Sequence, residues 1–141
     1  YWPSLPKYLH NELISYAQSA KNIRPTTRRG GDKYHHYSVP KHIETWCREN
    51  LPITDEYQVI LQRFFDTTFI PKHIDGQRAE TYNYILSEPG PTTRWFDIRG
   101  RVIDSFVFPC HQWYYLKVDE WHDVINIKNE RLALSLHIPF K

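Results

Sequence analysis

The stretch Arg131-Leu132-Ala133-Leu134-Ser135-Leu136-His137-Ile138 alternates between large apolar side chains and small or polar ones. Successive side chains of a β-strand point to opposite faces, so the three leucines and Ile138 share one face. Arg131, Ala133, Ser135 and His137 share the other face. We therefore expect a strand whose leucines are buried while Arg131 and Ser135 face a cavity.

Strand-like segments of a similar kind fill the preceding half of the sequence. Residues 57–70 are rich in β-branched and aromatic side chains and predict one strand, or two with a bend. Shorter strands are expected over residues 81–86, 93–98, 102–108, 113–118 and 123–127. The clearest turn between them is Ser87-Glu88-Pro89-Gly90-Pro91.

The beginning of the sequence differs, because its apolar residues recur at helical spacing. Residues 9–20 predict one helix, and residues 41–49 predict a second one that ends before Pro52. Between them, residues 23–37 are expected to form a loop, the most basic stretch of the chain, with Arg24, Arg28, Arg29 and Lys33 around two glycines. A solvated loop is the simplest interpretation, and a contact to substrate or phosphate is the alternative.

Two helices followed by a series of short strands predict a mainly β protein with flanking helices. This order favours a jelly-roll-like double sheet over alternating strand and helix units. The length of 141 residues predicts a single domain, residues 1–141. Aromatic residues make up 16% of the chain, which fits a β core of large side chains.

Charge and cysteine content exclude several classes of protein. A net charge of +2, with both signs spread along the chain, does not mark a nucleic-acid-binding protein, so nucleic acid is not expected as the main partner. Two cysteines are too few for a disulfide framework. No apolar run is long enough for a membrane span and no signal peptide is evident, so we expect a cytoplasmic protein without a membrane partner.

A carboxylate follows a histidine by two positions at three places: His10/Glu12, His42/Glu44 and His73/Asp75. The first two fall in predicted helices, where residues two apart do not face each other. On a strand, residues two apart point the same way, so His73 and Asp75 can hold one metal ion. With His122 they form two histidines and one carboxylate, the ligand set of non-haem Fe(II) oxygenases.

His73-x-Asp75, followed by His122 and by Arg131 at the start of the last strand, resembles the Fe(II)- and 2-oxoglutarate-dependent oxygenases. Residues 122–134 are similar to the aspartyl/asparaginyl and prolyl hydroxylase-like branches, and His122 lies nine positions before Arg131, close to the family's spacing. The resemblance covers roughly residues 57–138. It implies a double-stranded β-helix, a cupin-like jelly roll, with iron bound by His73, Asp75 and His122.

The resemblance also implies a cosubstrate site and a reaction. 2-Oxoglutarate would chelate the iron, and its far carboxylate would pair with the planar guanidinium of Arg131. Tyr82, Tyr84 and Ser135 are expected to point into the same cavity and to hydrogen-bond this cosubstrate. The implied activity is a dioxygenase that hydroxylates an unidentified substrate, a protein side chain or a small molecule, and releases succinate and CO2, with ascorbate as reductant.

Two other functions remain open at the level of the sequence. A non-catalytic jelly-roll binding module, cupin-like or carbohydrate-binding, would use the many aromatic residues as a platform. A nucleic-acid contact through the basic loop from Arg24 to Lys33 could coexist with the oxygenase if its substrate is nucleic acid. Binding of iron and 2-oxoglutarate separates the oxygenase from the binding module.

Overall fold

The computed structural model describes residues 2–19, 23–25, 34–65, 68–74, 78–87, 91–128 and 130–139. It contains two helices, α1 (Lys7–Gln18) and α2 (Lys41–Asn50). The strands are β1 (Ile23–Pro25), β2 (Tyr34–Ser38), β3 (Gln58–Phe65), β4 (Ile70–His73), β5 (Arg78–Ile85), β6 (Thr92–Phe96), β7 (Val102–Val107), β8 (Trp113–Lys117), β9 (His122–Ile125) and β10 (Glu130–Pro139).

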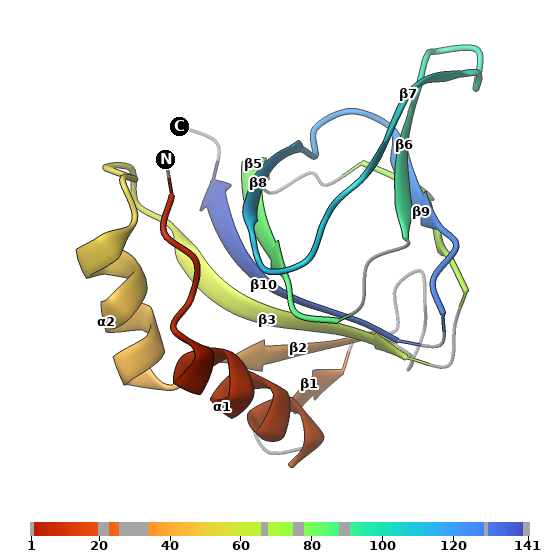
Figure 1. The fold of residues 1–141 in the computed structure, drawn as a ribbon. Coiled ribbons are helices and arrows are strands. Elements are labelled where there is room, and N and C mark those ends of the chain that lie inside the picture. The colour runs from red at the N-terminus through yellow and green to blue at the C-terminus, as the bar shows by residue number, and fades with distance from the viewer. Residues whose placement is uncertain are drawn as a thin grey trace.

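These strands form two antiparallel sheets. The larger sheet has the order β1-β2-β3-β10-β5-β8, and the smaller one has the order β4-β9-β6-β7. In Figure 1 the long strands β3 and β10 curve beneath the smaller sheet, and both helices lie on the other side of the larger sheet. The predicted jelly roll with flanking helices is therefore confirmed.

The leucine face of β10 forms the centre of the main core, between the larger sheet and the helices. Leu134 and Leu136 are fully buried and Leu132 is 3% exposed, as predicted. They pack with residues of both helices and of neighbouring strands: Leu9, Leu13, Ala17, Ile43, Cys47, Val59 and Leu61. Apolar residues at helical spacing thus meet apolar residues at strand spacing in one continuous core.

The opposite face of the larger sheet looks towards the smaller sheet. Phe64 of β3 packs against Ile70 of β4 and Val124 of β9, which joins the two sheets on one side. A second hydrophobic cluster contains Ile85 and Ala133 of the larger sheet and the partly buried Trp95 of β6 in the smaller sheet. Its other members are Phe108, Leu116 and Val118. Side chains on this inner face can therefore approach side chains of β4, β6 and β9.

Residues 23–37, predicted as a loop, contain the strands β1 and β2. These strands pair with each other, from Ile23 with Tyr37 to Pro25 with His35, and β2 also pairs with β3. The loop prediction was wrong at these positions, because pairing with a neighbouring strand overrides weak local β-propensity. Residues 26–33, with most of the basic side chains, lie outside the described part of the chain.

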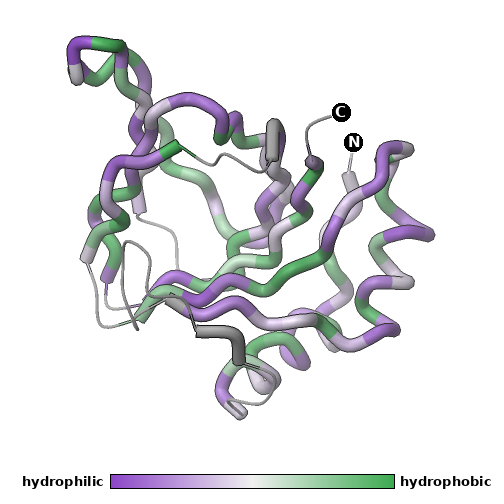
Figure 2. The backbone as a smooth tube through the Cα atoms, turned by 180° about the vertical axis from the view of Figure 1, so that it is seen from behind, coloured by the Kyte–Doolittle hydropathy of each residue, from purple (hydrophilic) through white to green (hydrophobic). Residues whose placement is uncertain are grey.

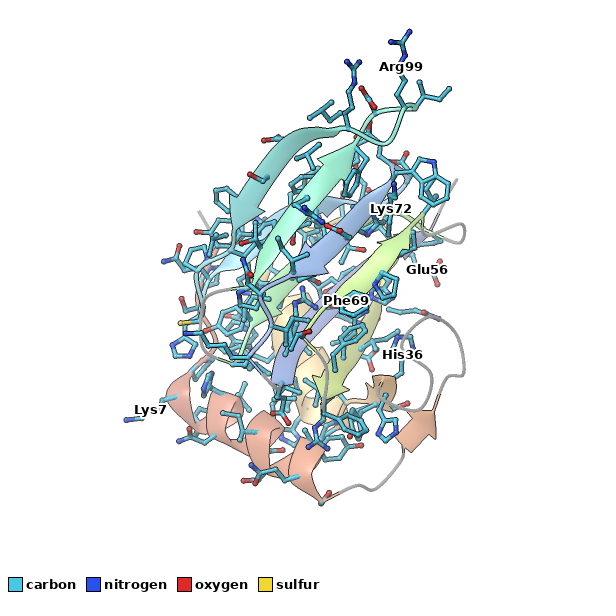
Figure 3. The ribbon with its side chains drawn as sticks, turned by 90° about the vertical axis from the view of Figure 1, so that its right-hand side faces the viewer. Lys7, His36, Glu56, Phe69, Lys72 and Arg99 are labelled. Carbon is cyan, nitrogen blue, oxygen red and sulfur yellow. The ribbon has the colours of Figure 1, made fainter. Side chains whose placement is uncertain are left out.

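The predicted segment 57–70 is divided between the two sheets. Its first part is β3, and its last residue begins β4, which pairs with β9 instead of continuing in the larger sheet. The smaller sheet is seen face-on in Figure 3, with Lys72 on β4 and Arg99 at the far tip of the β6–β7 hairpin. Lys72 lies over the ring of Phe96, 4.5 Å from its centroid.

The β6–β7 hairpin stands out from the rest of the molecule and mixes hydrophobic with hydrophilic residues (Figure 2). Its tip is held by Asp97, whose Oδ1 accepts hydrogen bonds from the backbone N–H groups of Arg99 and Arg101, each at 2.9 Å. Gly100 has a φ of +81°, a conformation that favours glycine. Neither helix in the described ranges has the length and apolar character needed to cross a membrane.

Candidate metal centre

The candidate centre begins with two neighbouring strands of the smaller sheet. β4 and β9 pair antiparallel, with Ile70 opposite Val124 and His73 opposite His122. The pairing is irregular between Ile70 and His73, so one extra residue brings His73 into register with His122. The two imidazole rings lie 4.3 Å apart between centroids, at an angle of 54°. Two histidines far apart in sequence thus become neighbours.

The two histidines are held in the same way. Nδ1 of His73 lies 2.7 Å from the carbonyl oxygen of Pro71, and Nδ1 of His122 lies 2.7 Å from that of Glu120. A carbonyl only accepts, so each Nδ1 is the donor of this contact, and Nε2 is the ring nitrogen through which a neutral imidazole would bind a metal. Metal-binding histidines typically have one nitrogen anchored by such a hydrogen bond. The pair therefore has the donor chemistry of a metal site.

The third predicted ligand is Asp75. Asp75 lies outside the described residues, two positions after His73, and the strand β4 ends at His73. Within the described ranges, no group of three or more His, Cys, Asp or Glu side chains could hold a metal ion. Of the three predicted ligands, His73 and His122 are therefore the two that lie among the described residues.

Arg131 lies on the inner face of the larger sheet. It is opposite Phe64 in the β3–β10 register, and Phe64 packs against Val124, two residues from His122 on the same face of β9. Arg131 and His122 thus both face the space between the two sheets, and both are buried, with 5% and 3% of their surfaces exposed. Arginine is seldom buried to this extent unless its guanidinium is paired.

Ser135 lies on the same inner face and belongs to a group of buried polar side chains. Its hydroxyl donates to Oδ1 of Asn83 on β5, at 2.5 Å. Nε2 atoms of Gln62 and His137 lie 3.3 Å apart on β3 and β10. The hydroxyl of Thr81, 1% exposed, has no hydrogen-bond partner among the described groups. The inner face is therefore polar along much of β10.

Tyr82 and Tyr84 do not point where the sequence analysis expected. Tyr82 is opposite Leu136 and Tyr84 opposite Leu134, so both belong to the helix-covered face of the larger sheet. Tyr84 is 2% exposed in the main core, where burial raises the pKa of its phenol. The predicted orientation of these two tyrosines was wrong. Both faces of β5 are covered, so the pattern of apolar and polar residues does not show which face of the strand is the inner one.

Asn83, Gln62 and Thr81 were not singled out from the sequence, and His137 was placed only on the face opposite to the leucines. They share the inner face with Ser135, as the registers of β3, β5 and β10 show. The sequence feature that pointed to this polar face was the alternation along β10, which places Ser135 and His137 on the same side of the strand. The partner residues on β3 and β5 follow only when the registers are known.

The other two histidine–carboxylate pairs lie on helices, as predicted. His10 and Glu12 belong to α1, and His42 and Glu44 belong to α2. Nε2 of His42 lies 2.6 Å from Oε2 of Glu12, so one member of each pair forms a contact between the two helices. These residues are well separated from the candidate centre by the larger sheet.

Two facing antiparallel sheets with an inner polar face define a cupin-like jelly roll. A Pseudomonas putida prolyl-4-hydroxylase has a similar structure, with a TM-score of 0.62 and 16% identity over 97% of this chain and 89% of that chain. Fe(II)-HppE has a TM-score of 0.52 and 10% identity, over 85% of this chain and 57% of that chain.

KdgF from Halomonas sp. is also similar, with a TM-score of 0.52 and 8% identity over 87% of this chain and 92% of that chain. No protein-family model matches the sequence, and a sequence comparison with curated proteins finds no match. At these identities the similarity shows the fold alone. The chemistry has to be argued from the residues of this chain.

Proposed function

We propose that this protein is an Fe(II)- and 2-oxoglutarate-dependent dioxygenase. The observation that carries the proposal is the contact between His73 and His122, whose rings lie 4.3 Å apart with each Nδ1 anchored to a backbone carbonyl. Asp75 would complete the ligand set, since it follows His73 by two positions in the sequence. Two imidazoles and one carboxylate suit Fe(II) and leave positions open for other ligands.

Arg131 would bind the cosubstrate. Its buried guanidinium faces the same interior as His122, and a guanidinium can hold a carboxylate through two parallel hydrogen bonds. In a site that excludes water such a pair is stronger than on the surface. We therefore assign Arg131 to the far carboxylate of 2-oxoglutarate, and Ser135 to the polar wall beside it.

The bound iron and 2-oxoglutarate would supply the oxidation: O2 and 2-oxoglutarate are consumed, one oxygen atom enters a C–H bond of the substrate and the other enters succinate, and CO2 leaves. The protein's own residues would orient these groups and keep water out. The buried inner face, with Phe64, Ile70 and Val124 on one side, has the apolar lining that such exclusion needs.

The metal site is tested by anaerobic calorimetry with Fe(II). Wild-type protein should bind one Fe(II), and His73→Ala and His122→Ala should weaken binding by more than the roughly 10- to 100-fold typical of losing an outer hydrogen-bond partner. His42→Ala is the matched control, because His42 is an exposed histidine paired with Glu12. It should bind Fe(II) like the wild type.

The activity is tested by succinate formation from 2-oxoglutarate with Fe(II), O2 and ascorbate, because uncoupled turnover needs no known substrate. We expect succinate from the wild type and from His42→Ala, and none from His73→Ala. Equal Fe(II) affinity in all four proteins would contradict the metal assignment. Absence of both Fe(II) binding and turnover would favour a non-catalytic jelly-roll binding module.

A further inference from the structure

A pocket lined by aromatic residues lies on the side of the larger sheet that faces away from His73 and His122. Residues of the N-terminal segment, of β5 and of the start of β8 line it: Trp2, Ser4, Tyr82, Gln112, Trp113 and Tyr115. We call it the aromatic pocket. Its volume is about 550 Å³, within the range of roughly 300–1,000 Å³ typical of small-molecule sites.

Aromatic rings form most of the wall. Trp2 stacks on Tyr82 at 4.4 Å between centroids and 27° between planes, and it contacts Trp113 at 5.9 Å. Tyr82 meets Tyr115 edge to face at 5.5 Å. These rings come from three separate segments, and their mutual contacts restrict their orientation. The pocket therefore presents preformed aromatic surface, which lowers the entropic cost of binding.

The residues that line the pocket are uncharged, and the nearest carboxylates, Glu80 and Asp55, lie outside this lining but close enough to raise the pKa of Tyr82. The side-chain oxygen of Gln112 accepts from the hydroxyl of Tyr114 at 2.9 Å, which orients its amide N–H groups as donors. Ser4 donates to the carbonyl of His111 at 3.0 Å and also forms a side-chain hydrogen bond with Tyr84. Burial raises the pKa of Tyr82 and of Tyr115, so both phenols stay protonated at neutral pH.

We propose that the aromatic pocket binds a neutral saccharide. The C–H faces of a sugar ring are apolar and pack on aromatic rings, while its hydroxyl groups need uncharged donors and acceptors at the rim. The pocket combines these two features, and none of its six lining residues is charged. Glu80 beside Tyr115, at 3.5 Å from its hydroxyl, adds one acceptor at the edge for a sugar hydroxyl.

A proline-rich peptide is the main competing ligand for an aromatic groove, and one contact disfavours it. Such peptides need a donor for their carbonyl groups. The indole N–H of Trp113 already donates to the carbonyl of Pro3 at 3.0 Å, within this chain's own N-terminal segment. The phenols and the Gln112 amide remain as donors, so a proline-rich peptide is included in the test.

Saccharide binding would be independent of the proposed metal centre. Tyr82 lies on the face of β5 opposite to Asn83, and Asn83 bonds Ser135 on the inner face. The larger sheet therefore separates the two sites. The aromatic pocket would recognise a sugar whether or not the protein is an oxygenase, so the failure of one proposal leaves the other standing.

The test is titration of the full chain with a panel of neutral tetrasaccharides, followed by tryptophan fluorescence and calorimetry. The panel contains cellotetraose, laminaritetraose, xylotetraose, maltotetraose, mannotetraose and chitotetraose, each to about 10 mM, since weak affinities are expected for a half-open site. At least one should bind and change the fluorescence. Tyr115→Ala should weaken that binding about tenfold or more, whereas Tyr115→Phe should retain it.

Tyr8→Ala is the matched control, because Tyr8 is an exposed tyrosine on α1, 68% exposed compared with 46% for Tyr115. Tyr8→Ala and His73→Ala should bind the sugar like the wild type. The proposal is overturned if none of the six sugars binds, or if sugar binding survives Tyr115→Ala. Binding of poly-L-proline that is lost in Tyr115→Ala, without sugar binding, would assign the pocket to a peptide instead.

Discussion

Arg131 is the residue whose chemistry most directly tests the cosubstrate assignment. Lysine keeps the positive charge but cannot form the two parallel hydrogen bonds of a guanidinium with a carboxylate. Arg131→Lys should therefore raise the dissociation constant of 2-oxoglutarate, measured by calorimetry with Fe(II) present and O2 absent. Fe(II) affinity and thermal stability should change little, since the charge remains.

Arg63→Lys provides the control for this substitution. Arg63 lies on β3, opposite Leu132, on the other face of the sheet, where it pairs with Glu130 at 2.9 Å. The affinity for 2-oxoglutarate should not change in this variant. If Arg131→Ala binds 2-oxoglutarate as tightly as the wild type, Arg131 does not hold the cosubstrate.

The two cysteines should differ in reactivity. Cys47 is fully buried in the main core, and burial raises the pKa of its thiol to about 12, whereas Cys110 is only partly buried. The thiolate is the reactive form, so at pH 9 iodoacetamide should modify Cys110 in the native protein and leave Cys47 intact. Mass spectrometry after digestion measures this, and denatured protein, with both thiols modified, is the control.

At the scale of single elements, β10 should be the most sensitive strand. Leu134 is fully buried between the larger sheet and the helices, with paired strands on both sides. Leu134→Ala should lower the free energy of unfolding by about 2 to 5 kcal/mol, measured by chemical denaturation. Ile98→Ala is the control, because Ile98 is 99% exposed. A loss below about 1 kcal/mol at Leu134 would contradict the central position of β10.

The tip of the β6–β7 hairpin should respond to acid. Hydrogen bonds hold the pKa of the Asp97 carboxyl below its ordinary value of 3.8, and the bond from the backbone N–H of Arg101 has the largest effect. A depressed pKa means that this contribution is present above the unfolded pKa and is lost as pH falls through the folded value. The protection of the Arg99 and Arg101 amides, measured as exchange relative to the intrinsic rate at each pH, should therefore fall once pH drops below 3.8. Asp97→Asn should exchange faster already at neutral pH.

For the whole molecule, bound ligands should stabilise both sheets together. The histidine pair belongs to the smaller sheet and Arg131 to the larger one, so Fe(II) with 2-oxoglutarate would connect them. A ligand at 100 times its dissociation constant adds about 2.7 kcal/mol to the stability of the native state. Thermal unfolding with Fe(II) and 2-oxoglutarate under nitrogen should show a higher Tm for the wild type.

The same ligands should leave the Tm of His122→Ala close to its value without them. Arg131→Ala should respond to Fe(II) but not further to 2-oxoglutarate. An equal rise in Tm for all three proteins would mean that the ligands bind elsewhere on the molecule.

Local patterns in the sequence were enough to predict the fold class. The alternation along β10, the helical spacing in α1 and α2, and the turn residues between strands act over a few neighbouring positions. Each pattern reports which faces of an element are apolar. Two helices and many short strands with such faces can be combined in few ways, and the jelly roll was among them.

Contacts between distant segments could not be obtained in this way. The registers that place His73 opposite His122, and Tyr82 opposite Leu136, depend on how complete sheets pack. The strands β1 and β2 likewise depend on β3, because β2 pairs with the edge of β3 and β1 pairs with β2. Strand period determines that side chains alternate, but when both faces of a sheet are covered, only packing against the helices and the second sheet decides which face is which.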